Sequence, residues 1–204
     1  MNWRIAILAV LTLAGASEAS RAADPRYPDW PCPQAKVPEI SIAAVWAGPA
    51  LDDVQNKWKD DAKVSALVAR LAARKTPLDE AEKAVKEFLG GSASDKTANA
   101  KLLFAGLFDT LNAQRSSVMN GLQRVTRKQR EAADKIRADT LELQALQGAT
   151  PRDETKVDAL SNQLIWETRI FEDRRKVVRF VCEVPTTIDQ RLFALGRVIQ
   201  QELE

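Results

Sequence analysis

The stretch that decides the fold is residues 143–157, LQALQGATPRDETKV, which separates two long apolar-periodic segments. Glycine commonly ends a helix, and Gly148 is placed to do so. A hydroxyl, a proline and a carboxylate commonly begin one, and they are supplied by Thr150-Pro151-Arg152-Asp153. The connection is therefore a tight turn. Because two long helices joined by a short turn lie antiparallel, this stretch predicts a helical hairpin.

The segment before the turn, residues 96–147, contains no proline and only two glycines, Gly106 and Gly121. One unbroken helix of this length would extend about 75 Å. Alternating steps of four and three residues from Phe104 to Leu146 define a seam in which ten of thirteen positions are apolar. The polar exceptions are Arg115, Gln129 and Asp139. Such regularity is typical of coiled-coil-like packing.

The segment after the turn continues the same spacing and predicts the returning helix of the hairpin. Its apolar seam residues are Val157, Leu160, Leu164, Phe171, Val178 and Val181. If the turn is centred near Ala149, equal steps outward place Cys182 beside Ser116. The hairpin should cover about residues 117–181 and project roughly 45 Å.

The remaining sequence predicts a compact helical base. One helix is expected over about residues 50–75. A second is expected to begin at Thr76-Pro77 with a hydroxyl cap and to end at Gly90-Gly91 with a left-handed glycine. Pro185 should end the hairpin, and a last helix should begin at residues 186–189. The apolar stripe of that helix is Ile188, Leu192, Leu195 and Ile199.

Residues 23–49 form a distinct N-terminal segment that holds six of the nine prolines. Prolines exclude a long helix, so the segment should be extended. Its large apolar residues should wrap over the helices, because they carry too much surface to leave in water. They are Tyr27, Trp30, Ile40, Ile42, Val45 and Trp46. The prediction is a Pro-rich extended segment followed by an all-α domain over residues 50–204.

Residues 1–22 have the pattern of a secretory signal peptide. Arg4 gives the positive end, and residues 5–14 are an apolar run too short to span a bilayer. Small residues favour cleavage after Ala19 or Ala22. The alternative is an uncleaved N-terminal anchor. Because no second apolar stretch follows, the expected product is soluble, in the periplasm or secreted.

The chain has two cysteines, Cys32 and Cys182. Exported chains meet an oxidising compartment, so one disulfide is expected, and two free buried thiols are the alternative. A bridge over about 150 residues stabilises the fold by at most about 5 kcal/mol in the chain-entropy model. Cys32 does not directly follow the apolar run, so a lipid anchor is not expected.

Composition narrows the classes of function. The chain has 30 basic and 28 acidic residues, which gives no field that favours nucleic acid, and it has no histidine to serve as base or metal ligand. The paired carboxylates Asp52-Asp53 and Asp60-Asp61 do not converge, because helix neighbours point in different directions. Ser116-Ser117 has no histidine to activate it. Calcium and phosphate-binding loops are also missing, so no catalytic residue, metal or cofactor is predicted.

Basic residues gather on both helices of the predicted hairpin. This basic belt consists of Arg124, Arg127, Lys128, Arg130, Arg174, Arg175, Lys176 and Arg179. Crowded like charges favour docking to an acidic protein surface, lipid head groups or an anionic polymer. Alternatively, the long stems shield the seam while nearby carboxylates form local pairs. Those carboxylates are Glu131, Asp134, Glu172 and Asp173.

The leading hypothesis is a non-enzymatic exported interaction protein, either a scaffold or a chaperone-like protein, that binds a protein partner or an anionic surface through the hairpin. A chaperone is expected to be a homo-oligomer, whereas an adaptor could be a monomer or a dimer. Two alternatives stay open. One is a carrier of a small apolar ligand between base helices near Trp46 and Trp58, and the other is a histidine-independent enzyme using carboxylates. Trp58 and Trp166 are expected in the core.

Overall fold

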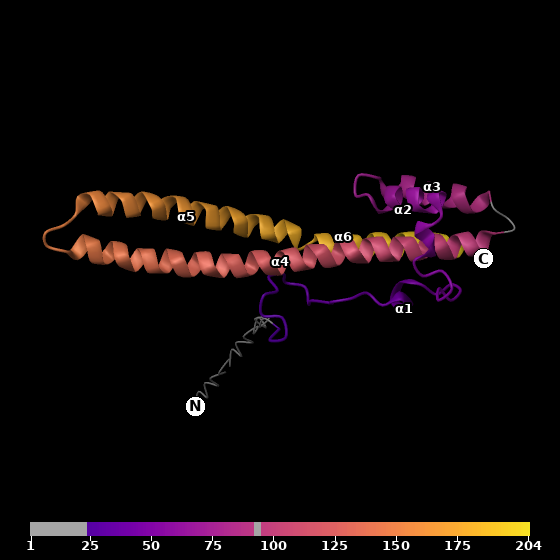
Figure 1. Ribbon diagram of the computed structural model, residues 1–204, viewed down its shortest axis with the longest axis horizontal. Coiled ribbons are helices and arrows are strands. Elements are labelled where there is room, and N and C mark those ends of the chain that lie inside the picture. The colour runs from indigo at the N-terminus through magenta and orange to yellow at the C-terminus, as the bar shows by residue number, and fades with distance from the viewer. Residues whose placement is uncertain (1–23, 92–94) are drawn as a thin grey trace, which may run out of the picture.

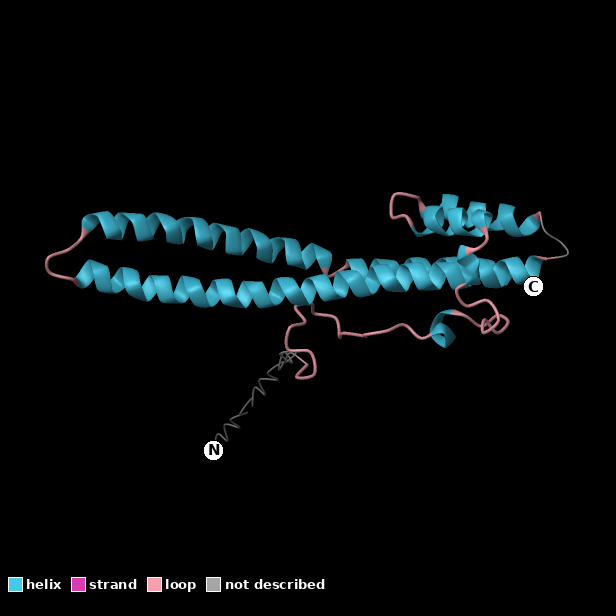
Figure 2. Ribbon diagram, viewed as in Figure 1, coloured by secondary structure: helices cyan, strands magenta, loops and turns pink. Residues whose placement is uncertain are grey.

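Helix α4 (Lys96–Gly148) is the axis on which the rest of the chain is assembled (Figure 1). The computed structural model describes residues 24–91 and 95–204, which contain helices and no strand (Figure 2). The predicted signal peptide, residues 1–22, lies outside the described residues. The other elements are α1 (Ile42–Val45), the 3-10 helix η1 (Lys57–Lys59), α2 (Ala62–Ala72), α3 (Leu78–Gly90), α5 (Glu154–Val181) and α6 (Val184–Gln201).

Two consecutive helices cover the length of α4. Helix α5 runs antiparallel along the half of α4 that ends at Gly148, and α6 continues along the half that begins at Lys96 (Figure 1). Helix α2 packs on α4, and α3 packs on α6. The all-α prediction is confirmed, and so is the combination of a helical base with a long antiparallel hairpin. We call the α4–α5 part the arm.

The core of the base is formed by apolar stripes of α2, α3, α4 and α6. Its largest fully buried side chains are Phe104, Leu71, Leu89, Leu103, Leu107, Leu111, Leu192, Leu195 and Ile199. Gly196 allows α6 to approach its neighbours closely. A Cβ at Gly196 would lie 2.9 Å from Phe104 Cε2 and 2.9 Å from the Val45 carbonyl oxygen. Any larger residue there would push α6 away from the core.

Arg115 occupies a seam position but is buried, with 4% of its side chain exposed. Its Nε lies 2.7 Å from Asp189 Oδ1 on α6, and its Nη1 donates to the Pro38 carbonyl oxygen at 3.3 Å. Burial raises the pKa of Asp189, while the Arg115 charge acts in the opposite direction. One guanidinium thus joins α4, α6 and the N-terminal segment.

The N-terminal segment lies along α4 and runs in the opposite direction (Figure 2). Lys36 Nζ donates to Gln123 Oε1 at 3.2 Å, and farther into the base the Trp46 ring stacks on Phe104 at a centroid distance of 4.2 Å. The segment forms two hydrogen-bonded turns over residues 24–30 and the single turn of α1, and it has no turn or helix over residues 35–41. The predicted wrapping is confirmed.

The prediction of one helix over residues 50–75 is wrong for the first half of this range. Asn56 has a φ of 65°, which is outside the helical region. The Asp61 carboxylate accepts hydrogen bonds from the backbone N–H groups of Lys63 (2.9 Å) and Val64 (3.0 Å). Helix α2 therefore starts at Ala62, because Asp61 satisfies the free donors at its N-terminus.

Three predicted helix ends also differ. The Thr76 hydroxyl donates to the Arg70 carbonyl oxygen at 2.8 Å and does not cap α3. Gly91, after α3, has a φ of −82°, so the expected left-handed glycine is not present there. Pro185 lies in the first turn of α6, where a proline is tolerated because its missing N–H would have no partner.

The register of the hairpin is shifted by between one and two turns from the predicted one, since Leu122 lies six residues from Ser116. Cys182 packs with Leu122 and not beside Ser116. The shift arises because Asp153 starts α5, accepting a hydrogen bond from the backbone N–H three residues later at 3.1 Å. The turn is therefore centred near Pro151 and not near Ala149.

Candidate functional site

Cys32 and Cys182 are joined by a disulfide with an Sγ–Sγ distance of 2.09 Å. Both are buried at the foot of the arm, where α5 ends and α6 begins, and they pack with Leu122. Val118 and Val178 contact the same cluster. The bond therefore ties the N-terminal segment to the foot of the arm.

Two residues of the basic belt hold the N-terminal segment. Arg127 Nη1 and Arg130 Nη1 donate to the two carboxylate oxygens of Asp29, at 2.9 and 2.6 Å. Arg130 also donates to the Pro28 carbonyl oxygen. The hydrogen bond from Arg127, together with the Arg130 charge, holds the pKa of Asp29 below its usual value. These two arginines therefore hold the N-terminal segment against α4 of the same chain.

The other six belt residues divide into two groups. Lys176 pairs with Asp173 one turn away on α5, at 3.1 Å on the exposed surface. Within the described residues, the remaining five have no carboxylate oxygen within 4.0 Å; they are Arg124, Lys128, Arg174, Arg175 and Arg179. Pairing with nearby carboxylates therefore accounts for only part of the basic belt.

Three of these unpaired cations line a groove of about 760 Å³ between α4 and α5 at the foot of the arm. They are Arg124 and Lys128 on α4 and Arg174 on α5. The remaining surface of the groove is mainly apolar. It includes Val118, Val125, Ile170, Val177, Val178 and Val181. The structure thus combines an apolar floor with a cationic rim.

Helix α5 has a second apolar stripe beside its seam, and two of its members, Ile170 and Val177, line the groove. The members of this stripe are exposed: Trp166 by 62%, Ile170 by 46%, Val177 by 58% and Phe180 by 76%. Val125 on α4 is 39% exposed and lines the same groove. Their steps of four, seven and three residues are those of one helix face. Apolar side chains gathered on a surface mark an interaction site more often than isolated ones do.

The groove continues toward the tip of the arm as a hollow of about 230 Å³ that also contains Ile170 and Arg174. A polar network then closes it. Lys135 Nζ lies 2.6 Å from Asp139 Oδ2 and 2.7 Å from Glu167 Oε1, which joins α4 to α5. These two carboxylates raise the pKa of Lys135. The open groove therefore lies between the disulfide and this network.

Trp166 was expected in the core, and this prediction is wrong, because its ring is 62% exposed on the second stripe. The guanidinium of Arg169 lies over this ring, 5.9 Å from its centroid. The spacing of Trp166, Ile170, Val177 and Phe180 was the sequence signal that could have revealed this stripe. The seam alone accounts for the helical periodicity of this segment, so periodicity does not separate the second stripe from it.

Trp46 and Trp58, near which a carrier site was considered, are both packed in the base. Trp46 stacks on Phe104, and its Nε1 donates to the Pro49 carbonyl oxygen at 2.8 Å. Trp58 is 8% exposed, and its Nε1 donates to Asp109 Oδ2 at 2.9 Å. Protein groups therefore occupy the ring surfaces and N–H groups that a ligand would need.

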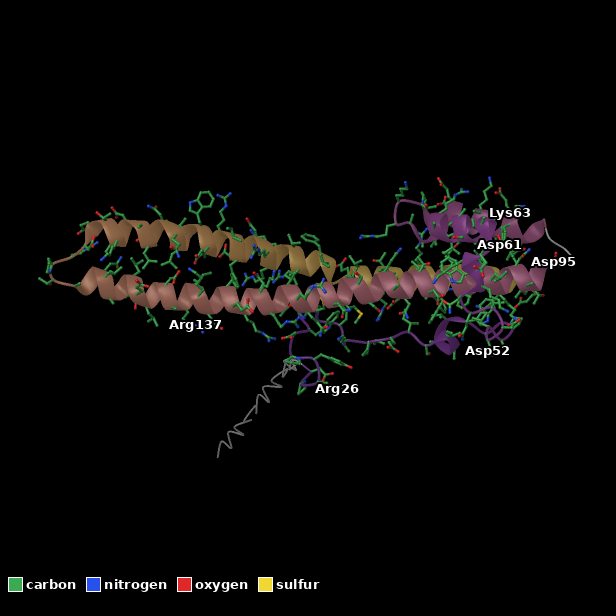
Figure 3. The ribbon with its side chains drawn as sticks, viewed as in Figure 1. Arg26, Asp52, Asp61, Lys63, Asp95 and Arg137 are labelled. Carbon is green, nitrogen blue, oxygen red and sulfur yellow. A yellow bond between two sulfur atoms is a disulfide. The ribbon has the colours of Figure 1, made fainter. Side chains whose placement is uncertain are left out.

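The two carboxylate pairs of the base are partly engaged in contacts of the fold. Figure 3 shows Asp52 on the side of α4 that the N-terminal segment follows, and Asp61 close to the start of α2. Asp53 forms an ion pair with Lys101 at 2.5 Å, which lowers the pKa of its carboxyl group, and Asp61 caps α2. Asp53, Asp60 and Asp61 line one open hollow of about 860 Å³, together with Lys57 and Lys63. Asp53 and Asp61 thus already have partners within the protein.

Residues 24–91 and 95–204 contain no group of three histidine, cysteine, aspartate or glutamate side chains placed to hold a metal ion. In the same ranges, every helix is too short or too polar to cross a bilayer. Comparisons with protein-family models, curated proteins and solved structures find no match to this chain.

Proposed function

We propose that this protein is a non-enzymatic exported protein that binds a protein partner along its α4–α5 arm. The observation that carries the proposal is the groove at the foot of the arm, where an exposed apolar floor meets Arg124, Lys128 and Arg174. The signal-peptide pattern of residues 1–22 and the Cys32–Cys182 disulfide support export to the periplasm or beyond the cell.

Docking explains two features that internal packing leaves unexplained. The second stripe leaves Ile170 and Val177 of the groove partly exposed to water, where each gives up the free energy that burial would provide. Arg124, Lys128 and Arg174 share one rim without an anionic neighbour within ion-pair distance in the described residues. A partner that covers the floor and carries carboxylates would satisfy both requirements.

Site-specific photo-crosslinking in the native compartment tests this proposal. The crosslinking amino acid replaces Val177 in the groove or, as a matched control, Leu141 nearer the tip. The two side chains are similarly exposed, at 58% and 62%. Val177 is expected to give adducts with one identifiable protein, whereas Leu141 is not.

The adducts must also depend on the rim. They should disappear in R124E/R174E and persist in R175E/R179E, which reverses two unpaired arginines that do not line the groove. Equal adducts from Leu141, or no adduct from Val177 in the native compartment, would contradict the proposal.

A further inference from the structure

The shape of the groove limits what can lie in it. Along α4 the lining runs from Val118 to Ile136, a distance of about 27 Å at the rise of an α-helix. Val177 is one residue away from the seam residue Val178, so the two point about 100° apart around α5. The second stripe therefore faces sideways from the seam. This is where a third helix packs against both members of a hairpin.

The lining also favours a helical occupant over an extended one. Each wall is the side of an α-helix, whose backbone N–H and C=O groups are already paired with one another. An extended peptide would find few partners for its own backbone groups along an apolar floor. A helix pairs its own backbone groups and presents only side chains.

The rim sets the charge of the occupant. Arg124 and Lys128 lie one turn apart on α4, and Arg174 lies on the opposite wall. The groove at the foot contains one carboxylate, Asp173, which is already paired with Lys176, and the hollow toward the tip adds Glu167, which is paired with Lys135. Both edges of the groove are therefore cationic, and a helix lying there needs acidic residues on both flanks of its apolar face.

A second copy of this chain fits poorly. Placing groove against groove would bring Arg124, Lys128 and Arg174 of each copy into one interface, where the lining carboxylates Asp173 and Glu167 are already paired with Lys176 and Lys135. Like charges facing each other across an interface suppress that pairing. The charge pattern thus favours a different, acidic chain.

Resting on the proposed function, we infer that the occupant is an acidic amphipathic helix of a partner protein, about five turns long. Its apolar face would cover Val125, Ile170 and Val177, and its flanking Asp or Glu residues would pair with Arg124, Lys128 and Arg174. The arm then becomes a three-helix bundle.

A pair of synthetic helical peptides of about 18 residues tests the inference. Both carry the same apolar face, and the flanks are glutamate in one and lysine in the other. Binding to the disulfide-bonded chain is measured by fluorescence anisotropy at moderate salt. The glutamate peptide should bind about tenfold or more tightly than the lysine peptide, since several charge pairs change sign.

Charge reversal in the protein provides the decisive test. The variant R124E/R174E should lose the glutamate peptide and gain the lysine peptide, a gain that misfolding cannot produce. The control R175E/R179E should keep the preference of the natural protein. Equal binding of the two peptides, or equal effects of the two variants, would overturn the inference.

Other occupants give distinct results. Displacement of the glutamate peptide by dodecanoate or by anionic phospholipid vesicles, with no photo-adduct to a protein, would assign the groove to an anionic amphiphile. Self-association that the peptide reverses would assign it to a second copy. A specific protein adduct at Val177, combined with no preference for the glutamate peptide, would overturn the helix inference and leave the proposed function standing.

Discussion

The two halves of α4 have the same heptad spacing but different surroundings. Near Lys96 the helix is enclosed by α2, α6 and the N-terminal segment, and Leu103, Phe104 and Leu107 are fully buried. Beyond the foot it has α5 beside it and, only as far as Arg130, the N-terminal segment as well. Leu122 is its last buried residue.

Helix α5 buries only Val157 among the described residues. The difference shows that an apolar seam alone does not make a closed core, because a helix must also be covered on its sides. The base supplies stability, and the arm is an open bundle whose exposed side can bind.

The largest expected effect contrasts two phenylalanines. Phe104→Ala should lower the free energy of unfolding by about 3–5 kcal/mol, because it leaves a cavity beneath Trp46 in the base. Phe180→Ala in the arm, where the ring is 76% exposed, should change it by less than about 0.5 kcal/mol. Urea unfolding followed by circular dichroism measures both. Similar losses would show that the arm is as closed as the base.

Removing the disulfide should have the next largest effect. The bond closes a loop with a sequence separation of 150, and C32S/C182S should lose about 2–5 kcal/mol of stability through the greater freedom of the unfolded chain. Reductant added to the natural protein should give the same loss. A double variant as stable as the natural protein would mean that the N-terminal segment is held by its other contacts alone.

A smaller effect contrasts two helical glycines. Gly196→Ala should cost about 1–3 kcal/mol, because its Cβ would meet Phe104 and the Val45 carbonyl oxygen in the base. Gly148→Ala at the end of α4 meets nothing within 4 Å and should be neutral or slightly stabilising. Thermal unfolding of the two variants measures both changes in stability. A neutral Gly196→Ala would mean that α6 packs less closely than the structure shows.

The smallest effect concerns pH at the foot of the arm. Because Arg127 and Arg130 lower the pKa of Asp29, this carboxylate contributes stability above its unfolded pKa and loses it as pH falls through the lower folded pKa. Carbon-detected NMR should give a midpoint below the ordinary 3.8, and Arg127→Gln should raise it. A midpoint at or above 3.8 in the natural protein would show that the Asp29 pairs are not formed in solution.

Much of the fold could be predicted because its signals are local. Gly148 and Asp153 lie close to the turn that they shape, and the prolines of residues 23–49 exclude helix wherever they occur. The start of α2 was not predictable in the same way. Val54 and Trp58 have helical spacing, but they reach the core through a turn and a 3-10 helix that depend on Asn56.

The site was predicted only in part, because its groups act across long sequence separations. The basic belt is visible in the sequence as a cluster of charges. Which of its residues bind the N-terminal segment and which stay unpaired depends on the position of Asp29. That residue meets Arg127 and Arg130 only after the N-terminal segment has docked along α4. The groove likewise depends on which side of α5 is left uncovered, a property of the assembled hairpin.

The most direct test of the open-bundle account is methyl NMR of valine-labelled protein titrated with the glutamate peptide. The account predicts that the signals of Val125, Val177 and Val181 move in the arm, while those of Val64 and Val85, buried in the base, stay in place. Shifts centred on the base valines, or none in the arm at saturating peptide, would contradict it.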